Sequence, residues 1–227
     1  MILAIDTAAD DCTVALASPG ELRMVRGAPG QTRLEHAMPL VHGLLGGPDG
    51  LLACEAFAFG AGPGAFTGLR VACTLAQGFG YASGKPVLAI GNLEAIAWAA
   101  LAGEGTEPRP GLVLVAVDAR MGEAYAGAWR SGGAGELACV REPFALPLAG
   151  LPDLVRELSP DALAGNAFPL AGIGARGPGL ADAGTIARIA MLRLAAGGGK
   201  SARDAAPCYV RDRVALTVAE RSAGLRL

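Results

Sequence analysis

The sequence predicts an α/β fold, because short apolar strands alternate with segments of helical spacing in both halves of the chain. The 227 residues are 52% hydrophobic and 18% charged, which is too apolar for a disordered chain. A stretch rich in Gly, Pro and charge at residues 103–111 separates the two halves, as linkers do. We therefore predict an N-terminal α/β domain over residues 1–103 and a C-terminal α/β domain over residues 104–227, whose last segment could pack back on the first domain.

The N-terminal half reads as a hairpin followed by alternating helices and strands. Residues 2–6 and 13–17 are apolar runs on either side of a polar turn, and a weaker strand lies near residues 22–26. Apolar residues recur at helical spacing over residues 34–45 and cover an arc of roughly 160°, wider than the ~100° stripe needed to dock on one sheet. A strand at 53–59, a glycine cluster at 60–70, a helix to about 80, a strand at 86–90 and a helix at 93–101 follow.

The C-terminal half opens with two predicted strands at residues 112–117 and 124–129 and then becomes punctuated by Pro and Gly until a helix near 185–196. The strand pair ILAID and TVALA is echoed by VLVAVD and AYAGAW. Internal duplication and a chance match of two short apolar strands both remain open as explanations.

Charge and cysteine content exclude several classes of protein. Nineteen basic and 21 acidic residues give a net charge of −2, which excludes a strongly basic nucleic-acid clamp. Five widely spaced cysteines without a CxxC motif favour a reducing compartment. The first residues lack the pattern of a signal peptide, and the longest apolar stretch is interrupted by Asn92 and Glu94, so we expect a cytoplasmic protein with no membrane span.

Hydrolase and metal motifs are missing from the sequence. It contains no HExxH, no G-x-S-x-G and no Cys/His nucleophile pair. His36 and His42 lie six residues apart on the predicted first helix, so they point about 240° away from one another. We expect no bound metal.

The glycine cluster is the strongest local signal. Its glycines permit positive φ or a close backbone approach, and Thr67 could cap the following helix, whose free N–H groups attract anions. A phosphate site and a tight turn for close helix packing are both compatible with it. Lys and Ser are missing where a Walker A motif would place them, and the match to a dinucleotide-binding fingerprint is poor.

Two acidic residues, Asp6 and Asp118, end apolar strands, where ligands meet the sheet in open α/β folds. Either could hold Mg²⁺ through water, or could accept hydrogen bonds from turn N–H groups. The segment from residue 200 to residue 227 carries a charge of +3 from six basic and three acidic residues. Arg211 and Arg213 could contact RNA there, although interleaved acids equally fit a solvated face.

Four segments resemble the TsaB (YeaZ) family: MILAIDTA, FGAGPGAFTGLRVACTLAQGF at residues 59–79, VDARMGEAY at 117–125 and PCYVRDRVALT at 207–217. The resemblance spans both halves. It implies a two-domain actin/Hsp70/sugar-kinase-like (ASKHA) fold, each lobe a mixed sheet with helices. It also implies a helper role in forming N6-threonylcarbamoyladenosine at tRNA position 37.

The resemblance further implies partners: a TsaD-like catalytic subunit, a TsaE-like ATPase, a second copy of the chain when alone, and tRNA within the complex. Two departures indicate that this chain does not catalyse. Residues 90–100 lack the HxxxH metal pair that TsaD carries, and Asp6-Thr7-Ala8-Ala9 lacks the glycine that wraps a phosphate. We expect no tightly bound cofactor, with ATP or ADP only at the interface of a complex.

The family also implies that the first helix and the helix after the glycine cluster pack against a partner, which matches the wide apolar arc of residues 34–45. The predicted partner face comprises Leu34, Met38, Val41, Leu45, Leu69, Cys73, Ala76 and Phe79. The other interpretation is that these residues are ordinary core, and we expect it to hold for half of them. Residues that would contact a nucleotide or phosphate are Asp6, Thr7, Gly62, Gly64, Thr67 and Asp118.

The sequence thus predicts a non-catalytic scaffold that activates a TsaD-type threonylcarbamoyltransferase, as a heterodimer or, when alone, a homodimer. The alternative is a nucleotide-dependent phosphotransferase of the same fold that uses Asp6, Thr7, the glycine cluster and Asp118. A peptidase has little support, because the nucleophile and metal motifs above are missing.

Overall fold

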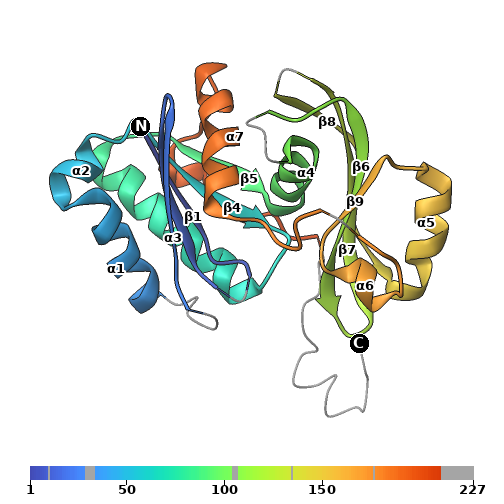
Figure 1. Cartoon of the computed structure of the whole chain (residues 1–227). Coiled ribbons are helices and arrows are strands. Elements are labelled where there is room, and N and C mark those ends of the chain that lie inside the picture. Colours follow the sequence, from blue (N-terminus) through green and yellow to red (C-terminus); the bar gives the residue numbers. More distant parts are fainter. Residues whose placement is uncertain (10, 29–33, 104–106, 134, 176, 211–227) are drawn as a thin grey trace, which may run out of the picture.

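The first half of the chain forms a five-stranded mixed sheet. The computed structural model describes residues 1–9, 11–28, 34–103, 107–133, 135–175 and 177–210 (Figure 1). The strand order is β3-β2-β1-β4-β5, with β1 Ile2–Asp6, β2 Thr13–Ser18, β3 Glu21–Arg26, β4 Ala56–Gly62 and β5 Val87–Gly91. The three N-terminal strands pair antiparallel, whereas β4 runs parallel to both β1 and β5.

A second mixed sheet repeats this plan in the C-terminal half. Its order is β8-β7-β6-β9, with β6 Gly111–Arg120, β7 Glu123–Gly133, β8 Glu136–Pro147 and β9 Ala162–Ala164. Again three consecutive strands pair antiparallel and the next one returns parallel to the first. The echoing segments noted in the sequence occupy β1 and β2 in one sheet and β6 and β7 in the other. This equivalence favours internal duplication over chance.

Helices cover both faces of both sheets. They are α1 Leu34–Leu45, α2 Pro48–Leu52, α3 Phe66–Ser83, α4 Asn92–Ala102, α5 Leu151–Leu158, α6 Ala167–Leu170 and α7 Ala183–Ala195, with 3₁₀ turns at Leu148–Gly150 and Ala202–Asp204. Because strand side chains alternate between faces, Leu3 and Ile5 join the core under α1 and α3, while Ile2 and Ala4 face α4 and α7. On the second sheet, Leu114 faces α5 and α6.

The two sheets share one apolar core, because α4 and α7 lie between them (Figure 1). Nearly every position of α4 is buried, as expected for a helix that is apolar all round. Ala4 of β1, Ile96 of α4 and Val115 of β6 belong to the same cluster of buried residues. The chain returns to the first sheet through α7, which packs on β1 and β2.

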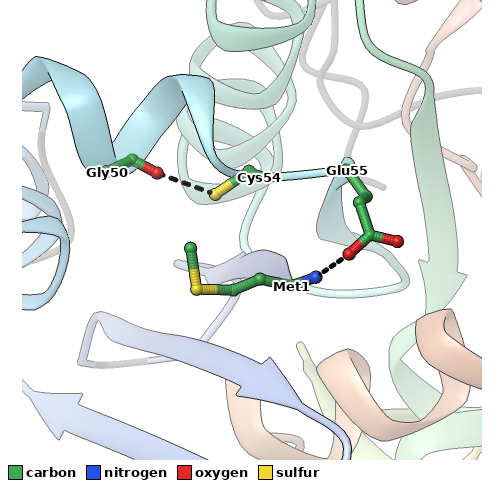
Figure 2. Close-up of polar contacts among 4 residues, drawn as sticks. All are labelled: Met1, Gly50, Cys54 and Glu55. Carbon is green, nitrogen blue, oxygen red and sulfur yellow. Dashed lines mark hydrogen bonds and ion pairs between the residues drawn. The ribbon is translucent and has the colours of Figure 1, made fainter.

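The predicted strand at 53–59 begins later than expected, at Ala56, because a short helix and its turn occupy the preceding residues. Ala53 ends α2, and its N–H bonds the carbonyl of Asp49. The Cys54 thiol donates to the carbonyl oxygen of Gly50 at 3.5 Å, and the Glu55 carboxylate pairs with the amino group of Met1 (Figure 2). That ammonium group lowers the pKa of Glu55. The five-residue α2 is too short to show helical periodicity.

Two strands and two α-helices of the C-terminal half have no counterpart in the sequence prediction: β8, β9, α5 and α6. Strand β8 lies at a sheet edge, and most of its described side chains are exposed or half-buried, so it lacks a continuous apolar signal. The predicted boundary between residues 103 and 104 stays a prediction, because residues 104–106 lie outside the described residues. Every helix in the described part of the chain is too short or insufficiently apolar to cross a membrane.

Candidate functional site

A cavity of about 410 Å³ opens where the two sheets meet, a volume in the range of small-ligand pockets, roughly 300–1,000 Å³. The ends of β1 and β6 and the starts of α3 and α4 contribute to its wall. The described lining residues that carry polar side-chain groups are Asp6, Asn92, Asp118, Arg120, Tyr125, Asn166, Cys208 and Tyr209. Both aspartates that the sequence placed at strand ends therefore reach one cavity.

Asp6 ends β1 and is only 1% exposed. Its Oδ1 accepts hydrogen bonds from the backbone N–H of Ala8 at 3.1 Å and from Nδ2 of Asn92 at 3.0 Å. Burial raises the pKa of Asp6 to about 6, and these two hydrogen bonds only partly oppose the effect. Space for the carboxyl group exists because residue 60 is glycine: a Cβ there would lie 2.3 Å from Oδ1.

Asn92 joins three parts of the site. In the sequence it stands out only as a polar residue within an apolar stretch. It begins α4 and is 5% exposed. While its Nδ2 donates to Asp6, its Oδ1 accepts the backbone N–H of Gly62 at 2.7 Å. One carboxamide thus fixes the ends of β1, β4 and α4. The available signal for it was a polar residue that interrupts the apolar stretch 87–103, as Glu94 also does.

Asp118 lies on the opposite side, in β6, next to a tight turn. Its backbone N–H donates to Oδ1 of Asn166 at 2.8 Å, and its carboxylate accepts the Arg120 N–H at 2.8 Å and pairs with the Arg120 guanidinium at 3.2 Å. Arg120 and Met121 both have positive φ, at 64° and 57°, an uncommon backbone conformation for residues other than glycine. The turn therefore holds Arg120 over the Asp118 carboxylate at the edge of the cavity.

The loop after β4 packs directly against the turn after β1. The Thr7 hydroxyl donates to the carbonyl of Gly68 at 2.6 Å, and the N–H of Ala65 donates to the carbonyl of Ala8 at 2.9 Å. A Cβ at Gly68 would lie 1.7 Å from the Thr7 carbonyl oxygen. Gly68 of the glycine cluster therefore allows close packing of α3. This supports the interpretation of the cluster as a tight turn for helix packing.

Among the six residues predicted to contact a nucleotide or phosphate, only Asp6, Gly64 and Asp118 line the cavity. Thr7 is fully buried, and the N–H of Gly62 is occupied by Asn92. The prediction that Thr67 caps the helix is wrong: α3 begins after Ala65, with no side-chain cap, and Thr67 lies within its first turn. The predicted tRNA contacts Arg211 and Arg213 lie outside the described residues.

Half of the predicted partner face lies inside the fold. Four of its residues are at most 5% exposed: Val41, Cys73 and Ala76 face the core under the sheet, whereas Leu69 lies at the cavity wall. For these four residues the ordinary-core interpretation holds, and they are removed from the predicted partner face. Met38, Leu45 and Phe79 are partly buried against the same core, and Leu34 is 49% exposed.

Two further apolar residues on this side of the sheet are more exposed than Leu34. Leu52, in α2, is 61% exposed and Tyr81, near the end of α3, is 69% exposed. Helix α2 contacts both α1 and α3, so the three helices are neighbours (Figure 1). We call Leu34, Leu52 and Tyr81 the outer helical face. Leu52 and Tyr81 could not be predicted from the sequence, because they do not belong to the apolar residues that recur at helical spacing.

Two solved structures resemble most of this chain. A solved structure from Pseudomonas aeruginosa, described as an uncharacterized protein with similarity to peptidase YEAZ, has 30% identity and a TM-score of 0.76 over 92% of this chain and 99% of its own. The chain belongs to the TsaB (YeaZ) family. A second structure, YeaZ from the same organism, has 29% identity and a TM-score of 0.75, covering 92% and 98%. The two-lobed ASKHA-like fold implied by the resemblance is confirmed.

Curated TsaB proteins match a shorter region. Haemophilus influenzae TsaB is 38% identical over 125 residues, and Escherichia coli TsaB is 35% identical over 125 residues. The matched region covers 55% of this chain and about half the length of these relatives, 51% and 52%. The family model TsaD, tRNA N6-adenosine threonylcarbamoyltransferase, matches residues 34–142.

Replacing Asp6 by Asn should stabilise the protein at neutral pH. The pKa of Asp6 is about 6 in the folded protein against an ordinary value of 3.8. The protonated carboxyl therefore favours the folded state below pH 4, and this contribution is lost as the pH rises through 6. At about 1.4 kcal/mol per pH unit, the cost at neutral pH is about 3 kcal/mol. Urea unfolding from pH 4 to 8 should show Asp6→Asn gaining stability over wild type as the pH rises. Asp153→Asn, at an exposed acid on α5, should follow wild type within about 1 kcal/mol. Parallel pH curves for wild type and Asp6→Asn would contradict the buried charge.

Two glycine substitutions in α3 should act in opposite directions. Gly68→Ala forces a methyl group against the Thr7 carbonyl and should cost at least about 2 kcal/mol. Gly78→Ala, where a Cβ meets nothing within 4 Å, should gain about 0.5–1 kcal/mol from helix propensity. Thermal or urea unfolding of both variants measures the difference. Equal stabilities would show that α3 does not depend on this contact.

Proposed function

We propose that this protein is a non-catalytic subunit in the formation of N6-threonylcarbamoyladenosine on tRNA, and that it binds and activates a TsaD-type threonylcarbamoyltransferase. A TsaE-type ATPase and tRNA join the resulting complex, and the chain pairs with itself when the partner is missing. Membership of the TsaB family supports the pathway, because the curated relatives are named tRNA threonylcarbamoyladenosine biosynthesis proteins.

The observation that carries the partner role is the outer helical face. Leu34, Leu52 and Tyr81 expose between 49% and 69% of their surface on three neighbouring helices. Apolar side chains gathered on one side of a protein mark interaction surfaces, and aromatic residues such as tyrosine are enriched in interfaces. Met38 and Leu45 of α1 and Phe79 of α3 are only partly buried and add apolar surface to the same helices.

The match to the TsaD family model suggests what covers this face. The matched region, residues 34–142, begins at α1 and includes α2 and α3. A TsaD-type protein would therefore carry equivalent helices. Two related surfaces can pair about an approximate twofold axis, as identical ones do in a symmetric dimer. The same geometry would allow a second copy of this chain to occupy the face.

The contacts between the turn after β1 and the loop after β4 support a helper role over independent phosphoryl transfer. A phosphate site needs free backbone N–H groups and hydroxyls. Here the Thr7 hydroxyl and the N–H groups of Gly62 and Ala65 already bond protein oxygens. We therefore place ATP or ADP only at a surface formed jointly with a partner.

Charged substitutions on the outer helical face should abolish partner binding without unfolding the chain. Leu34→Glu and Tyr81→Glu place a carboxylate in the proposed interface, where burying it unpaired costs several kcal/mol. Titration calorimetry with the TsaD-type protein of the same host should show affinity falling at least about 100-fold. Val140→Glu is the matched control, because Val140 is 46% exposed on β8 in the other lobe. Wild-type affinity in both face variants would overturn the proposed surface.

A further inference from the structure

The wall of the cavity includes a carboxylate oxygen, Oδ2 of Asp6, that the described residues leave without a hydrogen bond. Asp6 lines the cavity and is 1% exposed, and both hydrogen bonds to its carboxyl group end on Oδ1. Within the described part of the chain, Oδ2 accepts no hydrogen bond. Buried carboxylate oxygens normally have partners, because leaving one unpaired costs free energy. Oδ2 is therefore the atom of this cavity with most to gain from a ligand.

The charge around Asp6 favours a cation in that position. Arg120, which also lines the cavity, pairs with Asp118 at 3.2 Å, and no described cation lies within ion-pair distance of Asp6. Asp11 and Asp182 add further negative charge nearby and oppose ionisation of Asp6. A positively charged group at Oδ2 would relieve this repulsion, whereas an anion would increase it.

The remaining walls fit an apolar body. Leu69, Ile96 and Val117 line the interior. At the edge, the rings of Phe66 and Tyr209 lie 5.5 Å apart and are partly exposed. Aromatic faces attract cations, and the Arg70 guanidinium already lies 3.9 Å from the centre of the Phe66 ring.

We propose that this cavity binds a small organic cation, a protonated amine or amidine on an apolar body, whose N–H groups donate to Oδ2 of Asp6. The cavity volume, about 410 Å³, accommodates such a molecule. The site is independent of the outer helical face, so the two proposals can fail separately.

Benzamidine is a suitable probe, with neutral benzamide and anionic benzoate as matched controls of similar shape. Binding to the wild-type chain is followed by NMR titration at neutral pH. Benzamidine should saturate one site, bind at least about tenfold more tightly than benzamide, and shift the amide signals of Gly62 and Ala8, whose N–H groups bond the Asp6–Asn92 pair. Benzoate should not bind.

Two comparisons locate the cation at Asp6. Asp6→Asn retains an oxygen for the Ala8 and Asn92 hydrogen bonds and should lose at least about tenfold in benzamidine affinity, while Asp153→Asn should not change it. In wild type the affinity should weaken as the pH falls below 6, because the carboxyl becomes protonated. The proposal is overturned if benzamide binds as well as benzamidine, if benzamidine fails to saturate, or if the shifted signals lie away from the cavity.

Discussion

The shared apolar layer formed by α4 and α7 fixes the position of the cavity between the two sheets. Because both helices are buried between the two sheets, the ends of β1 and β6 are held across a single cavity. Separate cores would leave each sheet free to rotate about the connecting segment. The close packing of Ile96 with residues of both sheets makes the two lobes one structural unit, and the cavity is the polar end of that unit.

A second constraint, the contact of Gly68 with Thr7, directs the chemistry of that cavity. The contact brings α3 onto the turn after β1 and occupies groups that would otherwise receive an anion. On the side of the first sheet, the Asp6 carboxyl group, the Asn92 carboxamide and apolar side chains face the cavity, while the Asp118–Arg120 ion pair lies on the opposite side. The occupied groups of the loop are why we propose a ligand other than a phosphate for the cavity. The contact depends on a glycine, since a side chain at position 68 would push α3 away from the turn after β1.

Much of this arrangement could be predicted from the sequence, and the failures have physical causes. The hairpin, the long helices and the meeting of Asp6 with Asp118 follow from periodicity and from the position of strand ends. The burial of Val41 and Cys73 does not, because small apolar residues surround much of α1 and α3 and do not reveal which side faces the sheet. Strand β8 lies at a sheet edge, where one face of side chains is not required to be apolar, and helix α5 has only eight residues. Both therefore carry little periodic signal. The role of Asn92 emerges only when three separate segments come together.

The central claim, that this chain is required for threonylcarbamoylation of tRNA, is tested most directly by its depletion in the host. Bulk tRNA is then digested and its nucleosides are measured by mass spectrometry. The account predicts loss of N6-threonylcarbamoyladenosine with unmodified adenosine in its place, and recovery when the wild-type chain is restored. Unchanged levels of the modified nucleoside after complete depletion would contradict it.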